Sequence, residues 1–278
     1  MKAKKSLGQN FLKSNLILDK IIKAGEIDPD NLILEIGPGK GALTSKLLEK
    51  AGKVIAIEKD HDLFELLKIK FEKEIKDEKL ILIEEDILEL NVNEIFSSFL
   101  HGLAGIGTEG SEDLKKTSKK FRYKIIANIP YNITGAILKK FLGGDTQPTS
   151  MVLLVQQEVA QRIVARDKKE SLLSISVKAY GEPKIVAKVG ARYFSPQPKV
   201  DSSVIVIKNI SKRIFYENKI SEEDFWKLVK LGFAHKRKKL SGNLKSMNLS
   251  KNSSFEDLKD KRAENLSPKD WITLSLLT

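Results

Sequence analysis

Short apolar runs alternate along this chain with segments of helix length, and this alternation restricts the fold more than any other feature of the sequence. The runs that have the length and composition of buried strands are residues 32–36, 54–57, 80–83, 124–127 and 151–155. The segments of helix length include residues 43–51, 60–74 and 133–142. Strands that alternate with helices build βαβ units, so the sequence predicts an α/β fold with a mainly parallel sheet.

The pattern changes to helices after residues 204–208. The expected helices are residues 222–233, residues 255–262 and a last segment from Pro268. We therefore predict one domain over residues 1–208 and a small all-helical domain over residues 209–278. Residues 101–120 are rich in Gly, Ser, Thr and Lys and lack periodicity, so we interpret them as a flexible insertion in the first domain.

The charge balance of the chain is strongly basic. Its 278 residues include 49 Lys and Arg against 37 Asp and Glu, a formal net charge of +12. Such a surplus suits a polyanionic partner. A Lys-rich proteome would produce the same surplus, so basicity alone does not identify the partner.

Several kinds of site are excluded by composition. The chain has no cysteine, which excludes disulfides, thiolate metal ligands and cysteine nucleophiles. Its three histidines lie far apart in sequence, so no metal site is expected. No apolar stretch approaches the roughly 18 to 20 residues of a membrane span, and no signal core follows the basic N-terminus. We therefore expect a cytoplasmic protein that does not bind membranes.

A glycine-rich turn follows the first predicted strand and opens a helix. Gly37, Gly39 and Gly41 allow a tight turn and close approach of backbone to a ligand. The spacing is G-x-G-x-G, and Ala42 stands where a dinucleotide fingerprint has its third glycine. Glu35, just before the turn, suits an amine-bearing ligand better than a pyrophosphate. The turn therefore predicts a cofactor other than a dinucleotide.

Polar residues also follow the next predicted strands. Glu58 is placed to accept hydrogen bonds from ribose hydroxyls, and Asp86 from an adenine amino group. Taken singly, either acid would more often be a solvated residue at a strand end. Together with the glycine turn and Asn128, on four successive strand ends, they predict a nucleoside-containing cofactor.

The tetrapeptide Asn128-Ile129-Pro130-Tyr131 ends another predicted strand and indicates methyl transfer to an amino nitrogen. The Asn128 side chain and the Ile129 carbonyl offer hydrogen-bond acceptors for the two N–H groups of an exocyclic amine. Pro130 has no N–H to compete and biases Ile129 toward an extended conformation. Tyr131 offers a flat face for a base. Without its context, the tetrapeptide would more often be a strand end that runs into a proline turn.

Further motifs extend over nearly the whole chain. They are LGQNFL at 7–12, VQQEVAQR at 155–162, FSPQPKVDS at 194–202, FAHKRKKL at 233–240 and RAENLS at 262–267. With the glycine turn and residues 128–131, they make the chain resemble the S-adenosylmethionine-dependent ribosomal RNA adenine N6-dimethyltransferases of the small-subunit type. The resemblance implies a class I methyltransferase domain, Rossmann-like with seven strands, and S-adenosylmethionine as methyl donor.

The resemblance also assigns roles to residues. It implies that Asn10 and Leu12 cover the cofactor, and that Asn128 and the Ile129 carbonyl accept from adenine N6. The target adenine is unstacked from the RNA and stacks on Tyr131. The resemblance places Phe194 against the other face of the base. From the residues alone, a hydrophobic plug beneath a proline turn explains Phe194 equally well.

The densest basic cluster of the chain is Lys236-Arg237-Lys238-Lys239. Ordinarily it would be a solvated helix end, but its place in a matching motif indicates contact with RNA phosphates. His235 and Lys236 stand where relatives commonly carry glutamine and arginine, so this contact differs in detail.

The function that the resemblance implies is dimethylation of N6 of two adjacent adenosines, in the hairpin loop near the 3′ end of small-subunit (16S) rRNA, during ribosome assembly. The implied partner is the small ribosomal subunit, and a monomer is expected. One alternative is a large-subunit rRNA adenine methyltransferase that confers macrolide resistance. Another is a non-catalytic assembly or transcription factor on the same fold. A nucleotide-dependent oxidoreductase is disfavoured by the glycine spacing.

Overall fold

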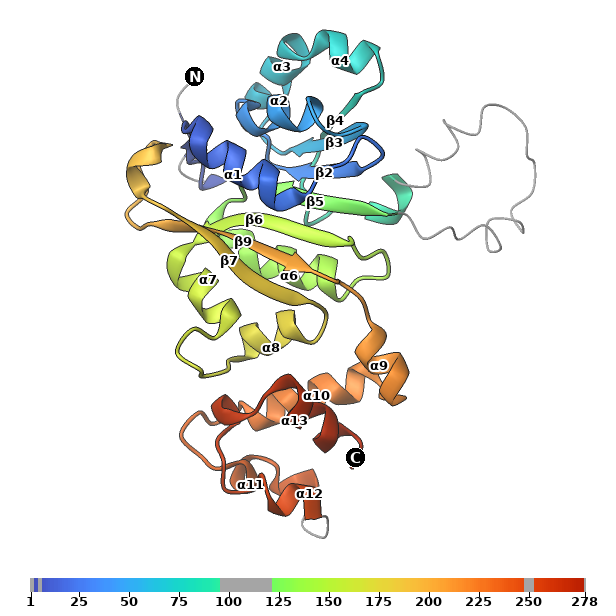
Figure 1. Cartoon of the computed structure of the whole chain (residues 1–278), viewed down its shortest axis with the longest axis vertical. Coiled ribbons are helices and arrows are strands. Elements are labelled where there is room, and N and C mark those ends of the chain that lie inside the picture. The colour runs from blue at the N-terminus through green and yellow to red at the C-terminus, as the bar shows by residue number, and fades with distance from the viewer. Residues whose placement is uncertain (1–2, 5–6, 96–121, 248–252, 278) are drawn as a thin grey trace, which may run out of the picture.

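A central sheet organises the computed structural model of the protein, which describes residues 3–4, 7–95, 122–247 and 253–277 (Figure 1). Seven strands form it in the order β4-β3-β2-β5-β6-β9-β7. In chain order they are β2 (Leu32–Ile36), β3 (Lys53–Glu58), β4 (Leu80–Glu84), β5 (Tyr123–Ala127), β6 (Ser150–Gln156), β7 (Glu182–Val189) and β9 (Ser202–Lys208). The first five are parallel, and β9 runs antiparallel between β6 and β7. This arrangement confirms the predicted α/β class I methyltransferase fold.

The strand predictions depend on burial. Leu34 and Ile125 pack on one face of the sheet, Ile33 and Ile126 pack on the other, and all four are fully buried. Such two-sided burial produces the continuous apolar runs from which β2 to β6 were predicted. The sequence did not predict β7, because this edge strand alternates between exposed and half-buried residues along most of its length.

Helices cover both faces of the sheet (Figure 1). They are α1 (Asn15–Gly25), α2 (Ala42–Leu48), α3 (His61–Lys70), α4 (Glu72–Lys76), α6 (Thr134–Leu142), α7 (Gln157–Val164) and α8 (Leu172–Lys178). The single helix expected over residues 60–74 was wrong. Phe71 leaves the helical conformation, at φ −114° and ψ 29°, and its buried ring lies against the backbone of Gly41. Asp60 is not the first helical residue but the N-cap of α3.

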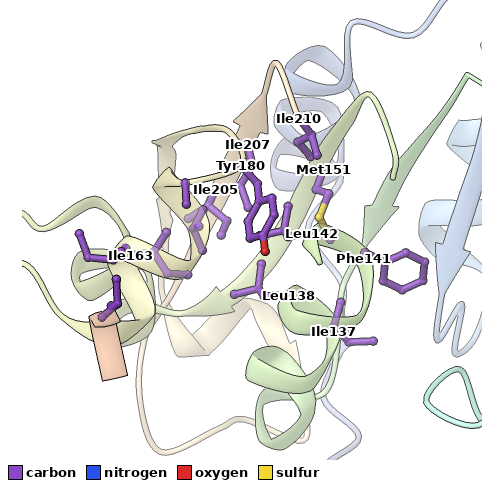
Figure 2. Packing of buried hydrophobic residues seen from close by; sticks show 14 of the residues in the cluster. Ile137, Leu138, Phe141, Leu142, Met151, Ile163, Tyr180, Ile205, Ile207 and Ile210 are labelled. Carbon is purple, nitrogen blue, oxygen red and sulfur yellow. The ribbon is translucent and has the colours of Figure 1, made fainter. Parts of the chain in front are cut away.

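The core on one face of the sheet joins α6 to the strands. Figure 2 shows Leu138 and Leu142 of α6 beside Met151 of β6 and Ile205 of β9. Tyr180, which follows α8, lies in the same cluster. This cluster continues into the helical region that follows β9.

The region after β9 is helical, as predicted. It contains α9 (Arg213–Asn218), α10 (Glu222–Gly232), α11 (Leu240–Asn243), α12 (Ser253–Glu256) and α13 (Pro268–Ser275). The helix expected over residues 255–262 was wrong, because the described chain forms only the short α12 there and continues in turns. Trp226 of α10 stacks on Tyr180, with ring centroids 6.1 Å apart, and donates a hydrogen bond to its hydroxyl at 2.9 Å. These contacts attach the helices to the sheet domain.

Two predictions about chain organisation are not tested by these observations. The boundary between residues 208 and 209 stays a prediction, although β9 ends at Lys208. The insertion at 101–120 lies outside the described residues. Within the described ranges, every helix is too short or too polar for a membrane crossing.

Candidate active site

A cavity of about 550 Å³ lies at the carboxyl ends of β2, β3, β4 and β5. The order of the strands brings these ends together, as expected for a parallel α/β sheet. The predicted site residues that line it are Asn10, Leu12, Glu35, Gly37, Gly39, Glu58, Asp86, Asn128, Ile129, Pro130 and Tyr131. Of the residues predicted to bind the cofactor or the target base, Gly41 and Phe194 do not line it.

The glycine turn forms one wall of the cavity. Gly37 and Gly39 have φ values of +64° and +60°, which favour glycine. A Cβ on Gly39 would stand only 3.0 Å from the ring of Phe11. The turn therefore packs against the N-terminal segment and leaves its backbone open to the cavity.

Gly41 allows the turn into α2, where the backbone has a positive φ and there is no room for a side chain. Its φ is +73°, and it precedes the first residue of α2. A Cβ at this position would clash with the ring of Phe71, at 2.5 Å. Contact between Gly41 and a cofactor stays a prediction.

Glu58 fixes the turn to the end of β3. Its Oε2 accepts a hydrogen bond from the Gly39 N–H at 3.0 Å, and its Oε1 accepts from the Asp60 N–H at 2.9 Å. Burial raises the pKa of Glu58, although these backbone donors oppose the rise. The carboxylate thus fixes both the glycine turn and the start of α3.

Glu35 is a buried acid in the cavity wall. Its exposed fraction is 1%, and burial raises its pKa to about 8. Its Oε2 has no hydrogen-bond partner within the described structure. A ligand with an amine or ammonium group near this oxygen would satisfy the acceptor and favour the ionised form.

Asp86 follows β4, the neighbour of β3 in the sheet, and lines the same cavity as Glu58. Partial burial opposes ionisation, but the Lys59 ammonium, 2.6 Å from Oδ2, holds the pKa of Asp86 below its usual range. Its Oδ1 accepts from the Leu88 N–H at 2.9 Å. A carboxylate that remains ionised in this way is a strong hydrogen-bond acceptor.

The amide of Asn128 has a defined orientation. Its Nδ2 donates to the main-chain oxygen of Asn10 at 3.2 Å, so Oδ1 is directed elsewhere. Neither this Oδ1 nor the Ile129 carbonyl accepts a hydrogen bond from any described residue. The hydroxyl of Tyr131 lies 2.6 Å from Ser202 Oγ, which anchors the tip of its ring. Two unoccupied acceptors and an anchored aromatic ring therefore belong to the same cavity lining.

Phe194 lies behind the cavity wall. Only 2% of it is exposed, and it belongs to the same apolar cluster as Leu12. The two residues pair across a small two-stranded sheet of β1 (Phe11–Leu12) and β8 (Phe194–Ser195). Phe194 is a core residue in this conformation, and its stacking on a base stays a prediction.

Sequence reasoning missed the residues that hold the N-terminal segment over the cavity. The buried Asp60 carboxylate accepts from Gln9 Nε2 at 2.6 Å and from Lys4 Nζ at 2.6 Å. The Lys4 N–H donates to Gln9 Oε1 at 2.7 Å. Gln9 belongs to a quoted motif, but nothing in the sequence indicates Asp60 as its partner.

The cavity fits S-adenosylmethionine. The unpartnered oxygen of Glu35 suits an amino group, and the open backbone at Gly37 and Gly39 admits a close ligand. Glu58 and Asp86 stand at neighbouring strand ends, as ribose and adenine require. In the described residues, no three His, Cys, Asp or Glu side chains cluster as a metal site requires.

The basic cluster 236–239 lies on the connection between α10 and α11, in turns and not on a helix. Lys239 forms an ion pair with Asp260 at 2.8 Å, and all four side chains are exposed. In Figure 1, this connection lies on the same side of the molecule as the carboxyl ends of the strands.

The whole chain matches a known protein family. A family model described as "Ribosomal RNA adenine dimethylase" matches residues 1–278. A protein of Dehalococcoides mccartyi named "Ribosomal RNA small subunit methyltransferase A" is 38% identical, over 99% of this chain and 88% of its own length. A protein of the same name from Fusobacterium nucleatum is 38% identical, over 98% of this chain and 96% of its own.

Solved structures agree with the sequence comparison. The crystal structure of a dimethyladenosine transferase from Plasmodium falciparum has a TM-score of 0.73 and 26% identity, over 96% of this chain and 95% of that one. The 23S rRNA methyltransferase ErmE, at 22% identity, shows the same fold with a TM-score of 0.69, over 96% of this chain and 98% of that one. The chain therefore belongs to the ribosomal RNA adenine dimethylase family, enzymes that use S-adenosylmethionine as methyl donor.

Proposed function

We propose that this enzyme dimethylates N6 of two adjacent adenosines in the hairpin loop near the 3′ end of small-subunit rRNA, during assembly of that subunit. The observation that carries the proposal is the orientation of Asn128. Its Nδ2 is engaged by Asn10, so its Oδ1 remains available beside the Ile129 carbonyl. These two acceptors match the two N–H groups of an adenine amine.

The acceptors act on the nucleophile. An amine conjugated to a ring is a poor nucleophile, and hydrogen bonds from its N–H groups to Asn128 and Ile129 keep its lone pair available for attack. Pro130 offers no N–H that could compete. Tyr131 holds the base by stacking, worth about 1 to 3 kcal/mol per base. Catalysis by these residues is mainly positioning.

Other residues of the same cavity would hold the cofactor. Glu35 would bind its amino group, Glu58 its ribose hydroxyls and Asp86 its adenine amine, while Asn10 and Leu12 cover it. When bound, S-adenosylmethionine supplies an activated methyl group and a neutral leaving group. No general base is needed for attack, because the proton is lost afterwards from a positively charged nitrogen. Burial raises the pKa of Tyr131, so its hydroxyl stays neutral at pH 7.

The small-subunit target is supported by the relatives. The curated relatives that are 35 to 38% identical carry a small-subunit name, whereas the 23S rRNA enzyme at 22% identity supports the fold alone. The quoted motif at 262–267 and the basic cluster also favour this target over the macrolide-resistance alternative. The glycine turn and the intact residues 128–131 argue against a non-catalytic factor.

We propose that Lys236, Arg237, Lys238 and Lys239 contact rRNA phosphates. The connection that carries these exposed residues lies on the same side of the molecule as the carboxyl ends of the strands (Figure 1), whose residues line the cavity, so one RNA surface could reach both. Such contacts supply affinity and salt dependence without reading sequence. We further propose that the enzyme acts as a monomer in the cytoplasm, where its ribosomal partner is assembled.

Labelled methyl transfer tests the proposal. The enzyme would be incubated with S-adenosylmethionine and under-methylated small subunits, or with large subunits, and the RNA digested and analysed by mass. We expect dimethyladenosine at two adjacent positions of small-subunit RNA only, and its loss with Asn128→Ala. Product from large subunits would favour the resistance enzyme. Cofactor binding without transfer to either subunit would favour an assembly factor.

A further inference from the structure

Outside the proposed active site, two segments meet at an open hollow of about 500 Å³. Gln156, Gln157 and Gln161, from the end of β6 and from α7, line one side, and residues 199–201 line the other. Both segments belong to sequence motifs, at 155–162 and 194–202, that the methyl-transfer site leaves largely without a role. The volume is in the range of ligand pockets, about 300–1,000 Å³.

The glutamines of the hollow have free hydrogen-bonding groups. Within the described part of the chain, the side-chain amides of Gln156, Gln157 and Gln161 have no hydrogen-bond partner. A glutamine amide presents a donor and an acceptor side by side, the arrangement that pairs with the edge of adenine. The chemistry of the hollow therefore suits a nucleobase.

The hollow is linked to the predicted base-stacking residue. Gln156 of β6 pairs with Ser202 of β9, and Ser202 Oγ lies 2.6 Å from the hydroxyl of Tyr131. The Gln157 N–H donates to the Asp201 carbonyl at 3.0 Å, which holds the two sides of the hollow together. Because Tyr131 lines the large cavity, these contacts connect the hollow to the place proposed for the target base, within reach of a neighbouring nucleotide.

The charges of the hollow favour a base over a phosphate. Glu158 and Asp201 contribute two acids, against one cation from Lys199. A phosphate would be repelled by this surplus, whereas the exocyclic amine of a base donates to carboxylate and amide oxygens. Val200, 46% exposed, adds an apolar surface for the base.

We propose that this hollow binds the base of the nucleotide adjacent to the target adenosine, which in the proposed substrate is the second adenosine. The inference rests on the proposed function. It assigns the glutamines of residues 156–161 to holding one adenosine while its neighbour is methylated.

A double-mutant cycle that combines a change in the protein with a change in the RNA tests the contact. Small subunits from cells that lack this methyltransferase would carry either the natural adenosine or a uridine beside the target adenosine. The rate constant kcat/KM for methylation of the remaining target would be measured for the wild type and for the double variant Gln157→Ala/Gln161→Ala. The matched control is Gln197→Ala, an exposed glutamine of the loop before β9 that lines neither cavity.

With adenosine as the neighbour, we expect the double variant to lose about tenfold or more in kcat/KM, as loss of a base contact implies. With uridine as the neighbour, its loss should be less than about twofold, because the contact is already missing. The control should match the wild type on both RNAs, and all proteins should bind S-adenosylmethionine equally.

Equal losses on the two RNAs, or no loss on either, would overturn the inference while leaving the proposed function intact. Failure of the wild type on the natural subunit would contradict the proposed function itself. If the double variant does not fold, Gln157→Glu serves in the same cycle, because it keeps the size and removes the donor. A larger loss of kcat/KM with adenosine than with uridine as the neighbour then supports the inference, and equal losses overturn it.

Discussion

Asn128 and Asn10 are joined by a hydrogen bond from the Asn128 side-chain nitrogen to the Asn10 main-chain oxygen, at 3.2 Å. The bond links the end of β5 to the N-terminal segment, across 118 positions of sequence. It also decides which end of the amide faces the cavity. The segment proposed to cover the cofactor thus orients the group proposed to bind the substrate amine.

Replacement of Asn128 by aspartate tests this orientation. Asn128→Asp keeps the size of the side chain but removes the donor to Asn10, so a carboxylate oxygen would face a carbonyl oxygen. We expect kcat to fall by about 100-fold or more, the usual scale for loss of one preorganised polar group at a reacting centre. Single-turnover methyl transfer and thermal unfolding measured side by side check this. An unchanged kcat would contradict the role of the amide.

Alanine at Gly39 should damage the cofactor site. The new Cβ would meet the Phe11 ring at 3.0 Å, and the φ of +60° costs an alanine about 1–2 kcal/mol. We expect weaker S-adenosylmethionine binding, by about tenfold, in calorimetric titration. Gly135→Ala is the control, since its Cβ on α6 would have no atom within 4 Å. That control should bind the cofactor normally and gain about 0.5–1 kcal/mol in stability.

The contact between Gln9 and Asp60 should matter for cofactor affinity. Gln9→Met keeps the length of the side chain but removes its hydrogen bonds to Asp60 and to Lys4. A hydrogen bond to a charged group is worth about 1.5–3 kcal/mol, so we expect the Kd of S-adenosylmethionine to rise about tenfold, with a smaller change in kcat.

Asp62→Asn is the matched control for this contact. Asp62 also forms an ion pair with Lys4, at 2.8 Å, but the structure gives it no hydrogen bond to Gln9. Cofactor affinity should be unchanged in the control. A Gln9→Met effect that persists undiminished on top of Asp60→Asn would show that Gln9 acts without Asp60.

Glu35 should make stability depend on pH. Its folded pKa of about 8 lies above the ordinary value of 4.5, so the folded protein binds a proton more strongly than the unfolded chain. Stability from this group is therefore fully present below about pH 4.5 and is lost as the pH rises toward 8. Glu35→Gln should flatten this decline in Tm between pH 5 and pH 8. Parallel curves for the two proteins would show that Glu35 ionises normally.

The basic cluster makes a prediction about salt. If Lys236 contacts a phosphate, Lys236→Ala should weaken subunit binding and reduce the slope of log K against log salt by about 1. Lys239→Ala should have a smaller effect, because Asp260 already pairs with Lys239. Filter binding at several salt concentrations measures both slopes. Wild-type slopes in both variants would place the RNA elsewhere.

The ends of the central strands could be predicted from the sequence because each of these strands is marked by its own run of consecutive apolar residues. An apolar run buried on both faces identifies a strand, and parallel strands bring their carboxyl ends to one edge, so Glu58, Asp86 and Asn128 could be placed together. The edge strand β7 has no such run. The interruption of the helix at Phe71 was not predicted for a different reason. The Phe71 ring packs against Gly41, and a contact between residues so far apart in sequence leaves no trace in the hydrophobic periodicity.

Long-range contacts explain what the sequence could not predict at the site. Asp60 looked like the start of a helix, and its partners Gln9 and Lys4 lie more than 50 positions away. Phe194 fitted two interpretations equally, and only the pairing of β8 with β1 shows that it is buried in this structure. The structural roles of such residues depend on contacts with residues far away in the sequence, so the local sequence does not predict them.

The pairing of Leu12 with Phe194 also has a consequence for synthesis. A growing polypeptide exposes its N-terminal strand to solvent long before the partner strand has been translated. Ser195 of β8 lines the cavity beside the residues of β1. The cavity wall that β1 and β8 form is therefore completed only after some two-thirds of the chain has been translated. Products that terminate before this point have the glycine turn and the strand-end acids, but not the enclosure that would retain a methyl donor.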